Sequence, residues 1–142
     1  MRYIIKDTPC GQIRGADTCK GYYYFQNVPY ATTQRWEIPQ ETTQWEGIYD
    51  ATLPTPHCLQ EAAFRTPKSP TRLFYNYESV VKQTFSFVED GLRLNIWTPA
   101  IAEKAPVLVY IHGGGFTGGC GHEKHFDGPV WPAHGGIGVT IN

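Results

Sequence analysis

Hydrophobic and polar residues form two successive patterns along this chain, and each pattern predicts a different kind of β-strand. Near the N-terminus three short strand-like segments, 3–6, 12–14 and 21–25, are separated by turn residues. Short strands divided by glycine- and proline-containing turns are typical of an antiparallel β-meander. The segment 29–57 carries four prolines among polar residues and predicts mostly loop. Residues 59–64 and 77–84 are helix candidates.

The second half of the chain predicts longer and more hydrophobic strands. In residues 92–97 (LRLNIW) apolar and other residues alternate, which indicates a strand with one polar face. Val107–Ile111 and Ile137–Ile141 are apolar runs, as expected of strands covered on both faces in a parallel sheet. Between them, residues 112–136 leave room for about two helical turns. The pattern therefore predicts an α/β fold.

Length, charge and composition restrict the classes of protein that fit. A chain of 142 residues suits one domain, and a net charge of −1 supplies no basic field for nucleic acid or an anionic membrane. No secretory signal or membrane-spanning run is present, and the four cysteines form no C-x-x-C pair. We therefore expect a soluble cytoplasmic protein with free thiols and with no nucleic-acid or membrane partner.

The chain ends at Asn142, directly after the apolar run 137–141. A parallel strand with two apolar faces needs covering helices and neighbouring strands. The expectation is that the predicted sheet is incomplete within residues 1–142.

The glycine run after the strand 107–111 admits three interpretations. The first is a dinucleotide site, because Gly113, Gly115 and Gly118 satisfy G-x-G-x-x-G. That motif also needs a helix that begins at its last glycine. Here the next residues are Gly119-Cys120-Gly121, which disfavour a helix start.

The second interpretation is a metal site. Cys120, His122, His125 and Asp127 are suitable ligand types, and His112 lies shortly before them. Zinc sites more often show tighter and more repetitive spacing. A polar surface loop that carries two histidines explains the same residues.

The third interpretation is an oxyanion hole. Acyl transfer places negative charge on a carbonyl oxygen, and preorganised backbone N–H groups stabilise that charge. A strand that ends in H-G-G-G supplies such donors in α/β-hydrolases. A glycine-rich turn without chemistry is the simpler alternative at this point.

A colinear series of segments, in order and spacing, resembles the type-B carboxylesterase family of α/β-hydrolases, which includes the cholinesterases. The matching segments are residues 11–15 (GQIRG), 27–31 (NVPYA), 35–36 (RW), 50–52 (DAT), 56–60 (PHCLQ), 88–99 (VEDGLRLNIWTP), the glycine run and 136–142. The resemblance covers nearly the whole chain. It implies the N-terminal part of an α/β-hydrolase fold, in which a small antiparallel β-meander precedes strands of a central, mostly parallel sheet, and residues 1–142 form an incomplete single domain.

The resemblance also assigns roles to individual residues. It makes Gly114 and Gly115 the oxyanion N–H donors and implies no cofactor and no metal. Supporting roles fall to residues that shape the loop or tie neighbouring segments together: His112, Gly113, Phe116 and the ion pair of Arg35 with Glu89. One departure is Gly91, which stands where the family often has a cysteine that bridges to the position of Cys58.

The groups that would attack an ester are absent from these residues. The family needs a serine in G-x-S-x-G, a histidine and an acid, whereas Ser69, Ser79 and Ser86 lack such flanking glycines. Cys120 could act as a nucleophile, but the sequence associates no His–carboxylate pair with it. The sequence thus predicts the N-terminal fragment of a carboxylic-ester hydrolase, which acts on a small-molecule ester. The alternative is a stand-alone, non-catalytic binding or interaction module.

Overall fold

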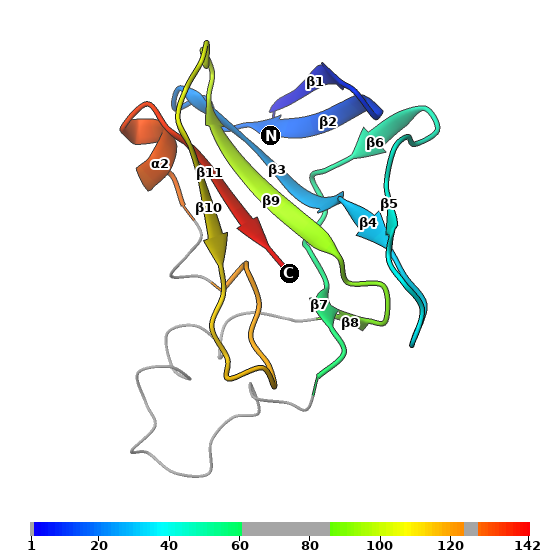
Figure 1. Cartoon of the computed structure of the whole chain (residues 1–142). Helices are drawn as coiled ribbons and strands as arrows, with labels where there is room; N and C mark the ends of the chain where they lie inside the picture. The colour runs from blue at the N-terminus through cyan, green and yellow to red at the C-terminus, as the bar shows by residue number, and fades with distance from the viewer. Residues whose placement is uncertain (1, 61–85, 124–127) are drawn as a thin grey trace.

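The computed structural model describes residues 2–60, 86–123 and 128–142, which form mostly strands (Figure 1). The elements in chain order are β1 (Arg2–Thr8), β2 (Gly11–Asp17), β3 (Tyr22–Pro29), β4 (Ala31–Thr32), β5 (Gln40–Glu41), β6 (Ile48–Asp50), β7 (His57–Cys58), β8 (Phe87–Val88), β9 (Arg93–Pro99), β10 (Val107–Ile111), α2 (Val130–Ala133) and β11 (Ile137–Ile141). The helix candidate 77–84 lies outside the described residues, as does most of 59–64, of which Leu59 and Gln60 are described and not helical.

One seven-stranded sheet organises the chain, in the order β1-β2-β3-β9-β11-β10, with β6 beside β2. β1, β2 and β3 pair antiparallel, so the predicted β-meander is confirmed. The described strands form a mixed sheet and not a mostly parallel one. β9 runs antiparallel to both β3 and β11, and the parallel pairs are β10 with β11 and β2 with β6.

A buried polar network joins β3, β9 and β11 where β3 bulges. The register of β3 against β9 shifts between Phe25 and Val28, and Asn27 adopts a φ of 57° there. The N–H of Asn27 donates to Thr55 Oγ1 at 2.7 Å and to Asn95 Oδ1 at 3.1 Å. The Asn95 amide also donates to Thr140 Oγ1 at 3.3 Å. Asn95 thus satisfies the backbone group that the bulge removes from the ladder.

The face of β9 that was predicted to be polar is buried. Asn95 and Trp97, on the face predicted to be polar, are 1% and 3% exposed. Leu94 and Ile96, on the other face, pack against a core cluster. The face of Trp97 is covered because α2 packs on β9 and β11, with Trp131 close to Gly138.

The main hydrophobic core lies on the face of the sheet that carries Leu94 and Ile96, and it is open on one side. Its buried members are Ile13, Phe25, Val28 and Ala51. Beside it is an apolar concavity of about 700 Å³, whose lining includes Leu94, Ile96 and Ile137. Apolar sheet surface of this extent is usually covered by another layer.

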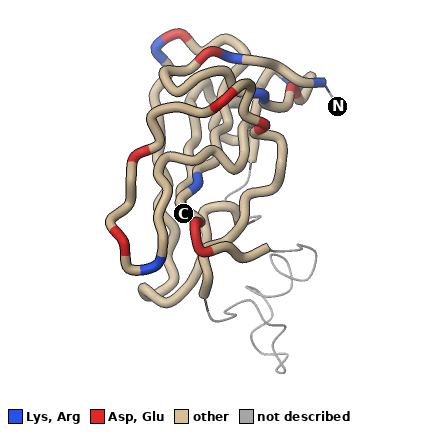
Figure 2. Tube along the Cα trace, turned by 90° about the vertical axis from the view of Figure 1, so that its right-hand side faces the viewer, with Lys and Arg blue, Asp and Glu red and all other residues tan. Residues whose placement is uncertain are grey.

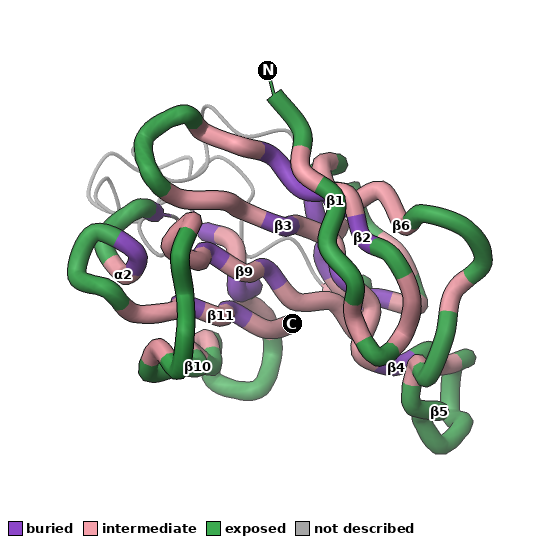
Figure 3. Tube along the Cα trace, turned by 90° about the horizontal axis from the view of Figure 1, so that it is seen from above, coloured by how far each residue is buried: buried purple, intermediate pink, exposed green. Residues whose placement is uncertain are grey.

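β10 contradicts the expectation that residues 107–111 are covered on both faces. This strand lies at the edge of the sheet and pairs with β11 alone among the described strands. Val107, Val109 and Ile111 are 58%, 55% and 72% exposed, and Figure 3 shows β10 as exposed beside the more buried β9 and β11. The apolar run is present, but no described layer covers it.

In the described part of the crossover from β10 to β11 there is one helical turn, α2, where the sequence left room for about two. No helix among the described residues is long and apolar enough to cross a membrane. Acidic and basic residues are interspersed along the described trace and are not segregated by sign (Figure 2).

Candidate functional site: the glycine loop after β10

The loop that follows β10 adopts backbone angles that require glycine. Gly114 has φ of +137° and Gly115 has φ of +62°. A Cβ added to Gly114 would lie 1.6 Å from the carbonyl oxygen of Gly118, whereas one added to Gly115 would meet nothing within 4 Å. The glycine at 114 is therefore demanded by a close backbone approach, whereas the φ of Gly115 favours glycine without requiring it, since Phe116 adopts the same φ.

The N–H groups of Gly114 and Gly115 point to no partner within the described part of the chain. The loop is closed through the carbonyl of Gly114, which accepts hydrogen bonds from the N–H and the Oγ1 of Thr117, both at 3.1 Å. No hydrogen bond joins either glycine N–H to a described residue. Both glycines are exposed and line a cleft of about 560 Å³. Two N–H groups without a described partner therefore belong to residues that line an open cleft.

Gln60 holds the far end of the glycine loop. Its side-chain amide donates to the carbonyl of Gly119 at 2.9 Å, and its Oε1 accepts from the N–H of Gly119 at 2.7 Å. This two-point contact fixes the backbone of Gly119, which has φ of +109°. Gln60 was missed from the sequence, although it ends the matched segment PHCLQ, which was the available signal.

Asn142, which lines the cleft, ties the end of β11 to four other segments. Its Oδ1 accepts from the N–H of Gly121 at 2.8 Å, and its Nδ2 donates to the carbonyl of Pro56 at 2.9 Å. Its own N–H donates to the carbonyl of Arg93 at 2.9 Å, and its carbonyl accepts a 2.5 Å hydrogen bond from the Tyr30 hydroxyl. Asn142 thus positions the segment that follows the glycine loop.

The predicted supporting residues occupy different surroundings. His112 Nδ1 lies 2.7 Å from the carbonyl oxygen of Gly113, at the start of the loop. Phe116 has φ of 62° and a fully exposed side chain. Arg35 and Glu89 form a two-point ion pair, with Nε to Oε1 at 2.7 Å and Nη2 to Oε2 at 3.2 Å. That pair does not line the glycine cleft, and the functional roles of these residues stay predictions.

Gly91 lies against Cys58, the pair that the resemblance singled out. A Cβ at position 91 would lie 2.5 Å from Cys58 Sγ and 2.9 Å from Cys58 Cα. Burial raises the pKa of the Cys58 thiol, which is free in this chain. The two positions are therefore adjacent in space although 32 residues separate them in sequence.

Cys120 does not belong to a polar surface loop, because it is completely buried. Burial raises the pKa of its thiol to about 12, so the group stays protonated at neutral pH and is a poor nucleophile. His122 lies beside it, together with His57, a residue that sequence reasoning missed. Burial lowers the pKa of His57 to about 3 and of His122 to about 4, so both rings are neutral. His125 and Asp127 lie outside the described residues.

The dinucleotide interpretation is wrong on structural grounds. It requires a helix at Gly118, but residues 118–123 contain no helix, and the next described helix begins at Val130. No helix N-terminus is therefore present at the glycine run to hold a pyrophosphate.

Comparison with known proteins shows to which family this fold belongs. Residues 3–142 match the profile of the carboxylesterase family. The chain is 32% identical to the para-nitrobenzyl esterase of Bacillus subtilis over 148 residues (all of this chain, 28% of that protein) and 32% identical to mouse carboxylesterase 3B over 146 residues (94% and 24%).

Solved structures give the same result. A thermophilic PNB esterase superposes with a TM-score of 0.75 at 32% identity, covering 97% of this chain and 27% of that one. A carboxylesterase of Geobacillus stearothermophilus gives a TM-score of 0.73 at 31% identity, covering 97% and 26%. The chain belongs to the carboxylesterase family, and it spans about a quarter of the length of these relatives.

Proposed function

We propose that these residues supply the oxyanion-binding loop of a serine esterase, whose nucleophile, acid and base lie outside residues 1–142. The observation that carries the proposal is the pair of N–H groups at Gly114 and Gly115, which have no partner among the described residues and face a cleft. Two adjacent donors of this kind match the negative oxygen that forms when an ester carbonyl is attacked.

In the proposed reaction, a serine from elsewhere in the domain attacks the ester carbonyl, and water later releases the acid from the acyl-enzyme. Gly114 and Gly115 hold the carbonyl oxygen as it becomes negative in each step. Each such donor typically lowers the barrier by about 3 kcal/mol, because it is fixed before the reaction and needs no reorganisation. Gln60 and Asn142 keep the loop in place.

The exposed apolar surfaces support the proposal that the nucleophile, acid and base lie outside residues 1–142. β10 exposes Val107, Val109 and Ile111 at the edge of the sheet. An apolar concavity of about 700 Å³ lies beside the hydrophobic core. A stand-alone module would leave both surfaces in water, which favours aggregation. We propose that further residues of the same domain cover them, in a protein of the cytoplasm.

A chimera tests the proposal. Residues 1–142 replace the matching segment of the Bacillus subtilis para-nitrobenzyl esterase, and hydrolysis of a para-nitrobenzyl ester is measured. The proposal predicts turnover by the chimera and none by residues 1–142 alone. A chimera that unfolds cooperatively, and is thus folded, but shows no turnover would contradict the proposal and favour a non-catalytic module.

A further inference from the structure

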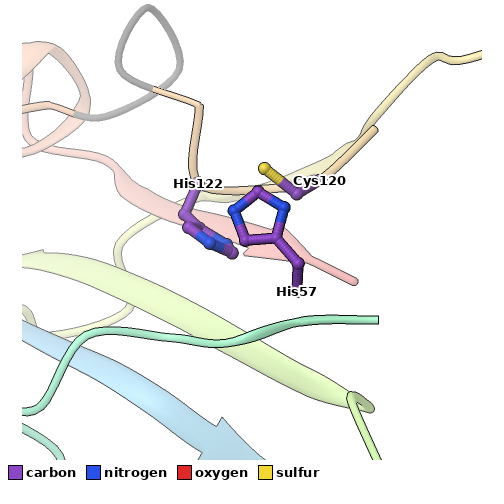
Figure 4. A group of neighbouring side chains, drawn as sticks. All are labelled: His57, Cys120 and His122. Carbon is purple, nitrogen blue, oxygen red and sulfur yellow. The ribbon is translucent and has the colours of Figure 1, made fainter. Parts of the chain in front are cut away.

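Three side chains with metal-binding atoms meet behind the glycine loop: the buried His57 and Cys120 and the half-buried His122 (Figure 4). His57 begins β7, and the other two belong to the turn that follows Gly119. Their ligand atoms all lie within 4.8 Å of one another. None of these three residues lines the glycine cleft, so the cluster is separate from the proposed oxyanion loop.

The two histidine rings contact each other, and the ring of His122 has no hydrogen-bond partner among the described residues. The rings of His57 and His122 meet edge to face, with centroids 4.3 Å apart. Both ring nitrogens of His122 are buried and make no hydrogen bond to a described residue. A polar ring buried without a hydrogen bond is unfavourable, which is the usual sign that a ligand is missing from a site.

The sulfur of Cys120 faces hydrogen-bond donors. The backbone N–H groups of His122 and Glu123 donate hydrogen bonds to it. Donors of this kind stabilise the negative charge of a metal-bound thiolate, and hydrogen bonds to the ligands are a regular part of metal sites. A neutral thiol in a purely apolar core gains much less from two such donors.

We propose that His57, Cys120 and His122 bind a zinc-type divalent ion. One sulfur and two imidazole nitrogens suit zinc, whereas calcium and magnesium prefer oxygen ligands. Ligand atoms around a tetrahedral zinc lie roughly 3.3–3.7 Å apart, since Zn–N is about 2.0 Å and Zn–S about 2.3 Å. The three side chains therefore need to close in by about 1 Å. The Cys120 thiol loses its proton to water as the Zn–S bond forms.

The ion would act as a structural clamp. It joins the turn at 120–122 to β7, and Gly119, one residue before that turn, closes the glycine loop against Gln60. Metal binding therefore fixes the C-terminal end of the loop without contacting the cleft. This role does not depend on the proposed esterase activity.

Cobalt absorption tests the site, because a thiolate bound to Co²⁺ gives a charge-transfer band that imidazole and water ligands do not. Residues 1–142, carried on a soluble fusion partner free of cysteine and histidine, are titrated with Co²⁺ and then with Zn²⁺. We expect one ion per chain, a thiolate band, and loss of that band when Zn²⁺ displaces Co²⁺. A chain that shows no thiolate band overturns the proposal.

Variants assign the ligands. Cys120→Ser should abolish the band and weaken Zn²⁺ binding about 100-fold or more, and His57→Asn should weaken it by at least about tenfold. The matched control carries Cys19→Ser and His134→Gln, two exposed residues outside the cluster, and should bind as the parent chain does. A band that survives Cys120→Ser overturns the assignment.

X-ray absorption of the zinc-loaded parent chain tests the ligand set without any substitution, so its result does not depend on the folding of a variant. The expected first shell holds one sulfur at about 2.3 Å and nitrogen ligands at about 2.0 Å. A shell without sulfur, or with two or more sulfurs, contradicts the proposed ligand set.

Discussion

Replacing Gly91 by cysteine should create a disulfide with Cys58, and the structure allows the effect to be worked out in two parts. The first part is steric. A Cβ at position 91 would lie 2.5 Å from Cys58 Sγ, 2.9 Å from its Cα and 3.0 Å from its N, so the backbone of residue 58 or 91 must shift. Shifts of this kind cost about 1–3 kcal/mol. Gly91→Ala carries this cost alone and should destabilise the chain by that amount.

The second part is the gain from closing a loop. A bond between positions 58 and 91 closes a loop of about 34 residues, and the chain-entropy relation gives about 3.8 kcal/mol for that length. Oxidised Gly91→Cys should therefore be more stable than its reduced form by about 3–4 kcal/mol. Relative to the parent chain, the oxidised variant should gain about 1–3 kcal/mol, while the reduced variant should resemble Gly91→Ala.

Urea unfolding, followed by tryptophan fluorescence with and without reductant, measures these differences. Peptide mapping by mass spectrometry identifies the linked cysteines, and Gly91→Cys combined with Cys58→Ser serves as the control that cannot form the bridge. The reasoning is refuted if position 91 links to Cys10, Cys19 or Cys120 instead, or if oxidation leaves the free energy of unfolding unchanged.

Three further changes test other parts of the fold. Asn95→Ala removes one of the two acceptors of the Asn27 N–H and the donor to Thr140, and should lower the free energy of unfolding by about 1–3 kcal/mol in urea, whereas an unchanged value would contradict the network. The Arg14 guanidinium lowers the pKa of Asp50 from 3.8 to about 2, so the pair stabilises the fold above pH about 4 and ceases to do so as the pH falls toward about 2. Asp50→Asn should flatten this part of the acid unfolding curve, and an unaltered slope would refute the assignment. Val109→Lys, on the exposed edge strand β10, should reduce self-association in sedimentation experiments without lowering stability.

The sequence predicted the positions of the strands better than it predicted which of their residues are buried. The β-meander was predictable because glycine and proline turns separate its short strands, and β10 and β11 were predictable as apolar runs. The exposure of Val109 was not predictable, because it depends on strand order and on which layers cover the edge. The burial of Asn95 was not predictable either, since the need for a buried acceptor arises only from the bulge at Asn27.

In the candidate site, too, one part was predictable from the sequence and another was not. The glycine loop was found because its chemistry lies in consecutive residues, and Gly114 and Gly115 are among its positions with positive φ. His57 was missed because it lies more than 60 residues before Cys120 in sequence, and only the pairing of β7 with β8 and the course of the later turn bring the two together. Contacts between distant segments carry no local periodicity that a sequence pattern could reveal.

The most direct test of the central claim is the turnover number of three alanine variants in the chimera. Gly113→Ala is the control, since it has no left-handed φ and open space at its Cβ, and it should keep kcat within about threefold. In Gly115→Ala the alanine must adopt a left-handed φ, which costs about 1–2 kcal/mol, and kcat should fall about tenfold. Gly114→Ala displaces the donor loop and should lose about 100-fold or more in kcat with little change in KM. Equal kcat for Gly113→Ala and Gly114→Ala would contradict an oxyanion role for this loop.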